Sequence, residues 1–440
     1  MSNYELALWS FPALLVLIFL RIPIALAMLT VAFGGTYLVT GATGMTLNQM
    51  KSLTFSTFSS YSLSIVPLFL LMGQFATLSG MSRSLFKTAE AFLGHRKGGV
   101  AMSAVGACAG FGAICGSSLA TAATMGQVAL PELRRYGYSG ALATGTLAAG
   151  GTLGILIPPS VILVIYAILT EQNIAKLFVA AMIPGLLAAL GYMCAIAIWV
   201  RISPNSGGTL PRVPWGARMR ALGKVWPVLT IFLVVVGGIY LGVFTPTEAA
   251  AVGAAGTGIA AALSGGMSWA KLVQAILATA SSTGMIFLIV LGAALFNGFL
   301  ALTQLPQHSA EWVAGQGFSP WFILTVVLIM YLAFGCIMDS LSMILLTVPI
   351  IFPIMSALDF GVPPAEFGLW FGILVLIVVE VGLITPPVGM NLFVINSMAK
   401  DIPIGQTFRG VLPFVLTDIL RVAILAAFPA ITLWLVWIVY

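Results

Sequence analysis

Charged residues are scarce in this chain of 440 residues. Only 7% of them are Asp, Glu, Lys or Arg, while 60% are hydrophobic. A soluble domain would need far more polar surface to face water, so this class is excluded. The 18 basic and 12 acidic residues fall mostly between apolar runs. Since about 20 apolar residues cross a bilayer as a helix, the composition predicts an all-α polytopic membrane protein.

The residues that build metal centres and hydrolytic sites are also few. His95 and His308 each stand alone in a connection, and the four cysteines show no C-x-x-C or Cys/His spacing. A resident metal centre needs three or four convergent ligands, so the sequence predicts none. No G-x-x-x-x-G-K-[ST] stretch is present, so nothing indicates a P-loop ATPase. Basic residues spread over short connections also argue against a nucleic-acid partner.

Basic residues are unevenly divided along the chain. A hydrophilic linker at 201–224, rich in Pro and Gly, separates residues 1–200 from residues 225–440. Up to residue 224 there are 14 basic and 4 acidic residues, and beyond it there are 4 and 8. Lys and Arg collect on cytoplasmic loops, so the linker and the loop at 83–97 are expected inside. The corresponding loop around Glu311 contains no Lys or Arg and is expected outside.

Short motifs recur in the same order in the two halves. FGAICGS at 111–117 returns as FGCIMDS at 334–340, and ILIPPSVIL at 155–163 returns as LITPPVGMN at 383–391. An ordered recurrence indicates an internal duplication. Corresponding loops on opposite faces, with five spans in each half, make the two copies inverted repeats. The expected spans are near residues 5–20, 22–40, 61–80, 139–170, 177–200, 225–242, 246–264, 281–303, 367–398 and 411–440.

One further segment in each half fits a helical hairpin that enters the membrane and returns. Residues 100–131 have basic residues on both flanks, and both flanks stay in the cytoplasm only if the segment does not cross. Gly116, Ser117 and Ser118 then form its tip. Residues 319–356 would enter from outside, with Met338, Asp339 and Ser340 at their tip. Non-helical backbone at this depth must be buried in protein or line a cavity, so we expect both tips to meet at a site.

Two spans are predicted to be broken at their middle. The spans at 139–170 and 367–398 each contain a double proline beside glycine, and consecutive prolines interrupt a helix. Inverted repeats, broken helices and midplane backbone together are typical of secondary transporters, in which carbonyl oxygens bind Na⁺. Oxygen ligands suit such a hard cation. The candidate Na⁺ ligands are Ser117, Ser118, Gly154, Ile157 and Pro159 at one site, and Asp339, Ser340, Gly382, Thr385 and Val388 at the other. The candidate substrate-binding residues are Ser117, Ser118, Thr121, Pro158, Thr385 and Asn391.

Carboxylates inside a membrane are costly and indicate function by default. Asp339 fits an ion site, or alternatively the N-cap of the second hairpin helix. Glu380 fits a proton relay, or a pair with Arg421 or Arg409. Glu248, in the sequence TPTEA, fits a helix cap. Because Gly116 corresponds to Asp339 in the repeat, the two ion sites need not be equivalent.

Two segments between spans have an amphipathic pattern. Residues 43–60 and 266–280 contain both apolar and polar residues and look amphipathic, which favours helices that lie in the plane of the interface. We expect them to brace a rigid scaffold, with a loop as the alternative.

The sequence resembles the large membrane subunit of the tripartite ATP-independent periplasmic (TRAP) transporters, the dicarboxylate-transporter M type, over essentially its whole length. The resemblance lies in FLRIPIA at 19–25, GAICGSSLATAA at 112–123, LGILIPPS at 153–160, GVFTPTEAAAVGA at 242–254 and GLITPPVGMN at 382–391.

The resemblance implies a Na⁺-driven elevator transporter, in which a transport domain slides against a scaffold in the bacterial inner membrane among its lipids. It implies a separate small four-helix membrane subunit and a periplasmic binding protein as partners, and organic-acid substrates such as C4-dicarboxylates or sialic acids. An ion or solute channel, a H⁺-coupled carboxylate transporter and an intramembrane hydrolase remain the alternatives.

Overall fold

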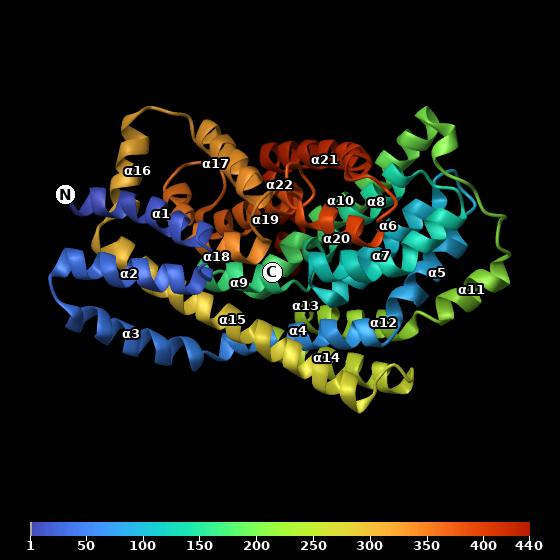
Figure 1. Cartoon of the computed structure of the whole chain (residues 1–440), viewed down its shortest axis with the longest axis horizontal. Coiled ribbons are helices and arrows are strands. Elements are labelled where there is room, and N and C mark those ends of the chain that lie inside the picture. Colours follow the sequence, from blue (N-terminus) through green and yellow to red (C-terminus); the bar gives the residue numbers. More distant parts are fainter. Residues whose placement is uncertain (1) are drawn as a thin grey trace.

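The computed structural model describes residues 2–440, with the side chains of all of these except residues 310, 313 and 314. The described residues form helices and no strand, so the all-α prediction is confirmed. Figure 1 shows that the two halves of the chain are interleaved and do not form separate lobes. For example, α2 (Ile24–Thr40) packs against α15 (Trp269–Leu302), and α8 (Gly140–Leu156) packs against α21 (Ile404–Ala427).

The remaining helices are as follows. Up to the linker they are α1 (Asn3–Phe19), α3 (Thr43–Phe58), α4 (Ile65–Leu78), α5 (Met81–Leu93), α6 (Gly99–Cys115), α7 (Ser118–Arg135), α9 (Val161–Leu169), α10 (Ile174–Ile202) and, in the linker itself, α11 (Trp215–Gly223). After it they are α12 (Trp226–Phe232), α13 (Gly238–Tyr240), α14 (Pro246–Leu263), α16 (Leu305–Gly315), α17 (Pro320–Gly335), α18 (Ser340–Ser356), α19 (Pro364–Gly382), α20 (Met390–Met398) and α22 (Pro429–Val439).

Short polar side chains mark the starts of several helices. The Ser139 and Ser160 hydroxyls accept hydrogen bonds from backbone amides in the first turns of α8 and α9. Such caps satisfy amides that have no partner within the helix. The predicted cap at Glu248 is confirmed, because its carboxylate accepts from the Thr245 amide at 2.8 Å.

Membrane-spanning candidates can be counted by length and apolarity. Five helical segments qualify by themselves, and two bent pairs bring the number to seven. One bent pair is α8 with α9, and the other runs from α11 to α13. Helices α1 and α2 are apolar but only 17 residues long. The ten expected spans are thus supported in part.

Both predicted hairpins are helix–turn–helix units. In the first, α6 ends at Cys115 and α7 begins at Ser118, and Gly116 between them has a φ of 65°. The Val100 amide, at the start of α6, donates to the Tyr138 hydroxyl just beyond α7 at 3.2 Å, so both ends lie together. In the second hairpin, Trp321 at the start of α17 packs edge-on against Phe360 beyond α18.

The two double prolines interrupt helices as predicted. Helix α8 ends before Ile157 and α9 begins at Val161, with a bend of 47° between them. Helix α19 ends at Gly382, and α20 begins at Met390. Both Pro–Pro bonds are cis.

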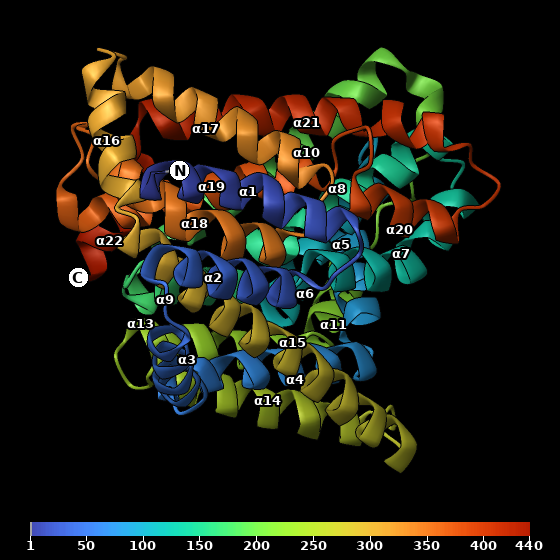
Figure 2. The ribbon, with the colours of Figure 1, turned by 60° about the vertical axis from the view of Figure 1, so that its left-hand side comes forward.

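Helices from the two halves pack in reciprocal pairs. In the predicted repeat, α2 corresponds to α14 and α4 corresponds to α15. Helix α2 packs against α15, and α14 packs against α4. Figure 2 shows these four stacked in the order α2, α15, α4 and α14. In the same way α7 packs against α20, while α18 packs against α9.

Two expectations of the helix boundaries are wrong. Residues 266–280 do not form a separate amphipathic helix, because α15 runs unbroken from Trp269 to Leu302. Residues 411–440 do not form one span, because the chain leaves the helical conformation at Phe428, just before Pro429. A proline after Phe428 disfavours helical backbone there. Residues 43–60 do form a separate helix, α3.

Candidate ion and substrate site

One buried carboxylate joins the two hairpin turns. Glu380 lies on α19 and is 1% exposed. Its oxygens accept hydrogen bonds from the Ser118 hydroxyl and, at 2.7 Å, from the Ser340 hydroxyl. Each serine is the first residue of the second helix of its hairpin. The turns therefore meet at Glu380, where the N-termini of α7 and α18 add partial positive charge.

Oxygen atoms gather where the first hairpin turn meets the break after α8. A Cβ built on Gly154 would lie 2.4 Å from Thr121 Oγ1 and 2.8 Å from the Ser117 carbonyl oxygen. The Thr121 hydroxyl is fully buried and has no hydrogen-bond partner among the described residues. On the other side of the turn, a Cβ on Gly116 would lie 3.3 Å from the Pro159 carbonyl oxygen. The absence of a side chain at both glycines lets these oxygens converge.

The two serines of this turn differ in the hydrogen bonds that their hydroxyls make. The Ser117 hydroxyl accepts from the Ala120 amide at 3.4 Å, so it caps α7, and only its carbonyl faces Gly154. The Ser118 hydroxyl donates to Glu380. Ile157 has extended backbone at the end of α8, which takes its carbonyl out of the helical hydrogen-bond pattern. Pro158, Pro159 and the rest of this break are buried.

The second hairpin meets the break after α19 in a corresponding way. A Cβ on Gly382 would lie 2.5 Å from the Cα of Gly335. In the first half, a Cβ on Gly112 would lie 2.4 Å from the Cα of Gly154. Gly335 corresponds to Gly112, and Gly382 to Gly154, in the repeated motifs. Each hairpin therefore contacts its broken helix backbone to backbone, through glycines at corresponding positions of the two motifs.

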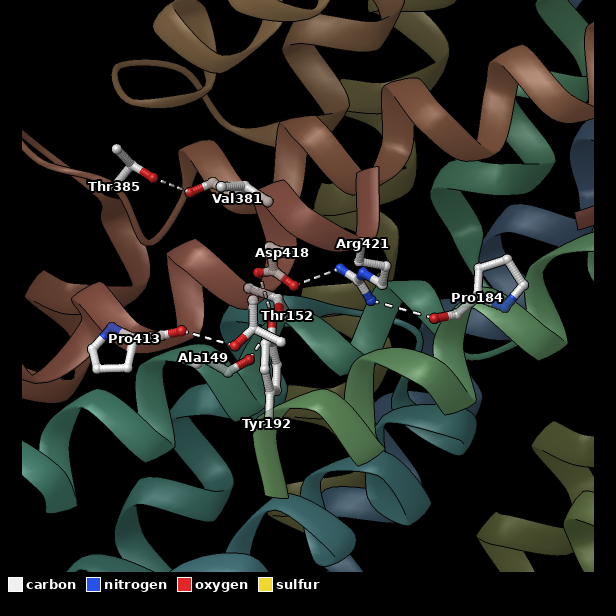
Figure 3. A network of polar contacts seen from close by, with 10 residues as sticks. Ala149, Thr152, Pro184, Tyr192, Val381, Thr385, Pro413, Asp418 and Arg421 are labelled. Atoms are coloured by element: carbon white, nitrogen blue, oxygen red, sulfur yellow. Dashed lines mark hydrogen bonds and ion pairs between the residues drawn. The ribbon is translucent and has the colours of Figure 1, made fainter. Parts of the chain in front are cut away.

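The second break is more exposed than the first. Thr385 and Val388 are half-buried, and Pro387 is exposed. The Thr385 hydroxyl donates to the Val381 carbonyl at 2.6 Å, which leaves its lone pairs free to accept (Figure 3). The Asp339 side chain is the N-cap of α18, which is the alternative to an ion ligand, because its carboxylate accepts a hydrogen bond from the Ser342 amide at 3.0 Å.

Asn391 links the start of α20, after the second break, to α8. It lies in the first turn of α20 and is fully buried. Its amide nitrogen donates to the Ala148 carbonyl on α8 at 3.3 Å, while its side-chain oxygen has no partner among the described residues. A buried amide with a free acceptor can bind a polar ligand, and so can the Thr121 hydroxyl.

A second polar network lies between α8, α10 and α21, and Figure 3 shows how its members face one another. The Tyr192 hydroxyl donates to Asp418 at 2.7 Å and lies 3.0 Å from the Thr152 hydroxyl. Arg421 donates to Asp418 at 2.7 Å and to the Pro184 carbonyl at 3.3 Å. The expected pair between Arg421 and Glu380 is therefore wrong.

The sequence analysis missed Tyr192 and Thr152. The available signal was a tyrosine inside an apolar run, since a buried tyrosine hydroxyl usually has a partner. Thr152 lies two residues before Gly154 on α8, so this network holds the helix that carries the first break.

Comparison with known proteins places the chain in a family. It matches the family described as "Tripartite ATP-independent periplasmic transporter, DctM component" over residues 11–431. It is 40% identical over 380 residues to the C4-dicarboxylate TRAP transporter large permease protein DctM of Pseudomonas aeruginosa, covering 86% of this chain and 87% of that protein. It is 30% identical to the sialic acid TRAP transporter large permease protein SiaM of Vibrio cholerae, over 95% of this chain and 96% of that one.

A solved structure shares the fold. The YdaH transporter of Alcanivorax borkumensis superposes with a TM-score of 0.61 over 87% of this chain and 89% of that chain, at 15% sequence identity. The family match covers nearly the whole chain, and so does the alignment with the Vibrio cholerae relative. This chain therefore belongs to the DctM family, the large permease component of the TRAP transporters.

Proposed function

We propose that this chain imports a small organic acid across the bacterial inner membrane and couples the import to Na⁺. The observation that carries the proposal is the meeting of both hairpin turns at Glu380 on α19, together with the unpartnered Thr121 hydroxyl where the first turn meets the break after α8. Secondary transporters place substrate and ion sites where broken helices expose backbone oxygens at the midplane. The names of the Pseudomonas aeruginosa and Vibrio cholerae relatives, which mention a C4-dicarboxylate and sialic acid, support the substrate class.

The first Na⁺ lies between the turn after α6 and the break after α8. Its proposed ligands are carbonyl oxygens of Ser117, Gly154, Ile157 and Pro159, with the Ser118 hydroxyl at the edge of the site. The convergence of the Ser117 and Pro159 carbonyls on the glycines of this contact supports the site. The unpartnered Thr121 hydroxyl lies beside it and is available to the ion or to the substrate.

The second Na⁺ lies at the corresponding place in the second half. Its proposed ligands are Ser340, Gly382, Thr385 and Val388, with Asp339 contributing through its backbone, since its side chain caps α18. The greater exposure of this break makes the two sites unequal, as the exchange of Gly116 for Asp339 predicts.

The substrate lies between the two ions. Asn391 and Thr121 supply buried polar groups, Ser117, Ser118 and Thr385 line the approach, and Pro158 shapes the wall. An organic anion there is stabilised by the N-termini of α7 and α18 and by the two cations, since no Lys or Arg side chain of the described residues makes a hydrogen bond or ion pair with Glu380.

The two halves form inverted repeats, and their hairpins and broken helices move together as a transport domain. The reciprocal packing of α2 with α15 and of α14 with α4 supports the repeat. The matching glycine contacts, Gly112 with Gly154 and Gly335 with Gly382, support it independently. The stack of α2, α15, α4 and α14 is the proposed scaffold against which the transport domain slides.

The partners are a separate small four-helix membrane subunit and a periplasmic protein that delivers the substrate. The family description names a tripartite periplasmic transporter, of which this chain is one component. A H⁺-coupled carrier is the second candidate, because Glu380 is a buried carboxylate held only by two serine hydroxyls among the described residues.

Uptake by proteoliposomes that contain the chain and both partners tests the proposal. We expect accumulation of the organic acid to need an inward Na⁺ gradient. Thr121→Val should raise the Na⁺ or substrate concentration needed for half-maximal uptake. Thr257→Val is the matched control, because Thr257 is equally buried but its hydroxyl donates to Gly253 within the scaffold helix α14. Accumulation driven by a proton gradient in the absence of Na⁺ would instead establish the H⁺-coupled carrier.

A further inference from the structure

A basic cavity lies between α5 and α11, far in sequence from the Glu380 site. Its volume is about 600 Å³. Helix α5 contributes Arg83 and Lys87, and α11 with the residue that follows it contributes Arg220 and Lys224. In each pair the spacing of four residues places both cations on one helix face. No acidic residue lines the cavity.

Three of these four cations are uncompensated. Lys87 donates to Glu132 at 2.9 Å and to Glu90 at 3.1 Å, so its charge is already matched. Arg83 and Lys224 make no side-chain hydrogen bond or ion pair to the residues that the structure describes, and Arg220 donates only to the Gly216 carbonyl at 3.4 Å. Uncompensated cations that face one cavity favour an anion, and the guanidinium fork of arginine suits a phosphate.

The surroundings of the cavity place it at the membrane surface. Trp215, the first residue of α11, and Trp226, the first residue of α12, are 62% and 63% exposed. Exposed tryptophans are enriched at the level of lipid headgroups. A smaller adjoining cavity of about 170 Å³ shares Ser84 and Lys224, and its other lining residues are Ser79, Met81, Pro227, Val228, Ala260 and Ser264. The space thus has a charged mouth and an extension of mixed polar and apolar lining.

We propose that this cavity binds an anionic phospholipid of the cytoplasmic leaflet. Its phosphate lies between Arg83, Arg220 and Lys224. The Ser84 hydroxyl, which also lines the cavity, is available to a glycerol headgroup, whereas the Thr88 hydroxyl donates to the Ala221 carbonyl at 2.9 Å. Basic pockets on the cytoplasmic side of membrane proteins bind such headgroups.

The site has a structural consequence for the first hairpin. Helix α5 packs against both α6 and α7, and Lys87 ties it to Glu132 on α7. Helix α11 packs against α5. A lipid held between α5 and α11 therefore fastens the linker to the helix that leads into the hairpin.

Native mass spectrometry of the full-length chain, released from nanodiscs, tests the proposal. The nanodiscs contain equal amounts of phosphatidylglycerol and phosphatidylcholine. We expect retained phosphatidylglycerol on the native chain and a loss of affinity of roughly fivefold for each charge removed, or roughly 30-fold for Arg220→Gln with Lys224→Gln. Arg201→Gln removes an exposed charge from the end of α10, outside the cavity, and should retain the lipid.

Retention of phosphatidylglycerol by the double variant at the level of Arg201→Gln would overturn the proposal. A second arm distinguishes a lipid from a soluble anion, with inorganic phosphate added to chains in the mixed phosphatidylglycerol and phosphatidylcholine nanodiscs. Phosphate that binds in millimolar amounts and displaces phosphatidylglycerol would show a soluble-anion site and reject the lipid. Arg220→Lys keeps the charge and should keep most of the binding, which separates loss of charge from loss of folding.

Discussion

Removal of Arg421 should destabilise the chain strongly, because Asp418 would then be a buried charge without a cation. The side chains of Arg421 and Asp418 are 6% and 1% exposed, and their closest atoms lie 2.7 Å apart. Loss of one partner from a buried pair costs about 3 to 5 kcal/mol, since the remaining charge stays desolvated. In Arg421→Met, Asp418 keeps only the hydrogen bond from Tyr192. We expect a decrease of this size in the free energy of unfolding, measured in mixed detergent micelles.

The double variant Asp418→Asn with Arg421→Met is the control that isolates the pair. It removes both charges together, so it should be more stable than Arg421→Met by about 2 kcal/mol or more. A double variant whose loss equals the sum of the two single losses would refute the reasoning, because the two charges would then be independent.

The remaining predictions concern the first ion site and the cytoplasmic surface. Gly154→Ala places a methyl group 2.4 Å from the Thr121 hydroxyl oxygen, so half-maximal uptake should need about tenfold more Na⁺, equivalent to about 1.4 kcal/mol. Gly34→Ala, in open space on α2, should leave uptake unchanged, and an equal effect of both variants would argue against the site. Lys87→Gln should cost about 0.5 kcal/mol of unfolding free energy, since this ion pair is half exposed. Burial lowers the pKa of Lys87, but the carboxylates of Glu132 and Glu90 outweigh this and raise the pKa above 10.5 overall. The stabilisation that Lys87 gives the folded chain is therefore fully present below pH 10.5 and is lost as the pH rises through the raised pKa. In thermal unfolding, the difference in stability between the native chain and Lys87→Gln should thus stay constant between pH 6 and pH 9.

The hairpins and the helix breaks could be predicted because their causes are local in sequence. A double proline interrupts a helix wherever it stands, and Gly116 permits the positive φ of the first turn. The recurrence of both features in one order predicts the repeat. The same local reasoning identified the cap at Glu248.

The partners of the buried carboxylates could not be predicted in this way. Glu380 is 262 residues from Ser118 and 40 residues from Ser340, and only the packing of the hairpins against α19 brings them together. Reasoning from charge left a proton relay and a pair with Arg421 or Arg409 open for Glu380, but Arg421 lies one helical turn from Asp418 and pairs with it. The prediction of where α15 begins was wrong for a related reason. A polar stretch such as residues 266–280 extends a helix when its neighbours pack against it, and amphipathic pattern alone does not reveal this.

Cysteine labelling of the hairpin flanks tests the central claim most directly, namely that two hairpins enter from opposite faces and meet at Glu380. Single cysteines replace Arg96, Arg135, Gln316 or Asp359, all exposed, in a background without the four native cysteines. The account predicts that a membrane-impermeant maleimide labels positions 96 and 135 only from the cytoplasm, and positions 316 and 359 only from the periplasm. Labelling of positions 96 and 135 from opposite sides would contradict it.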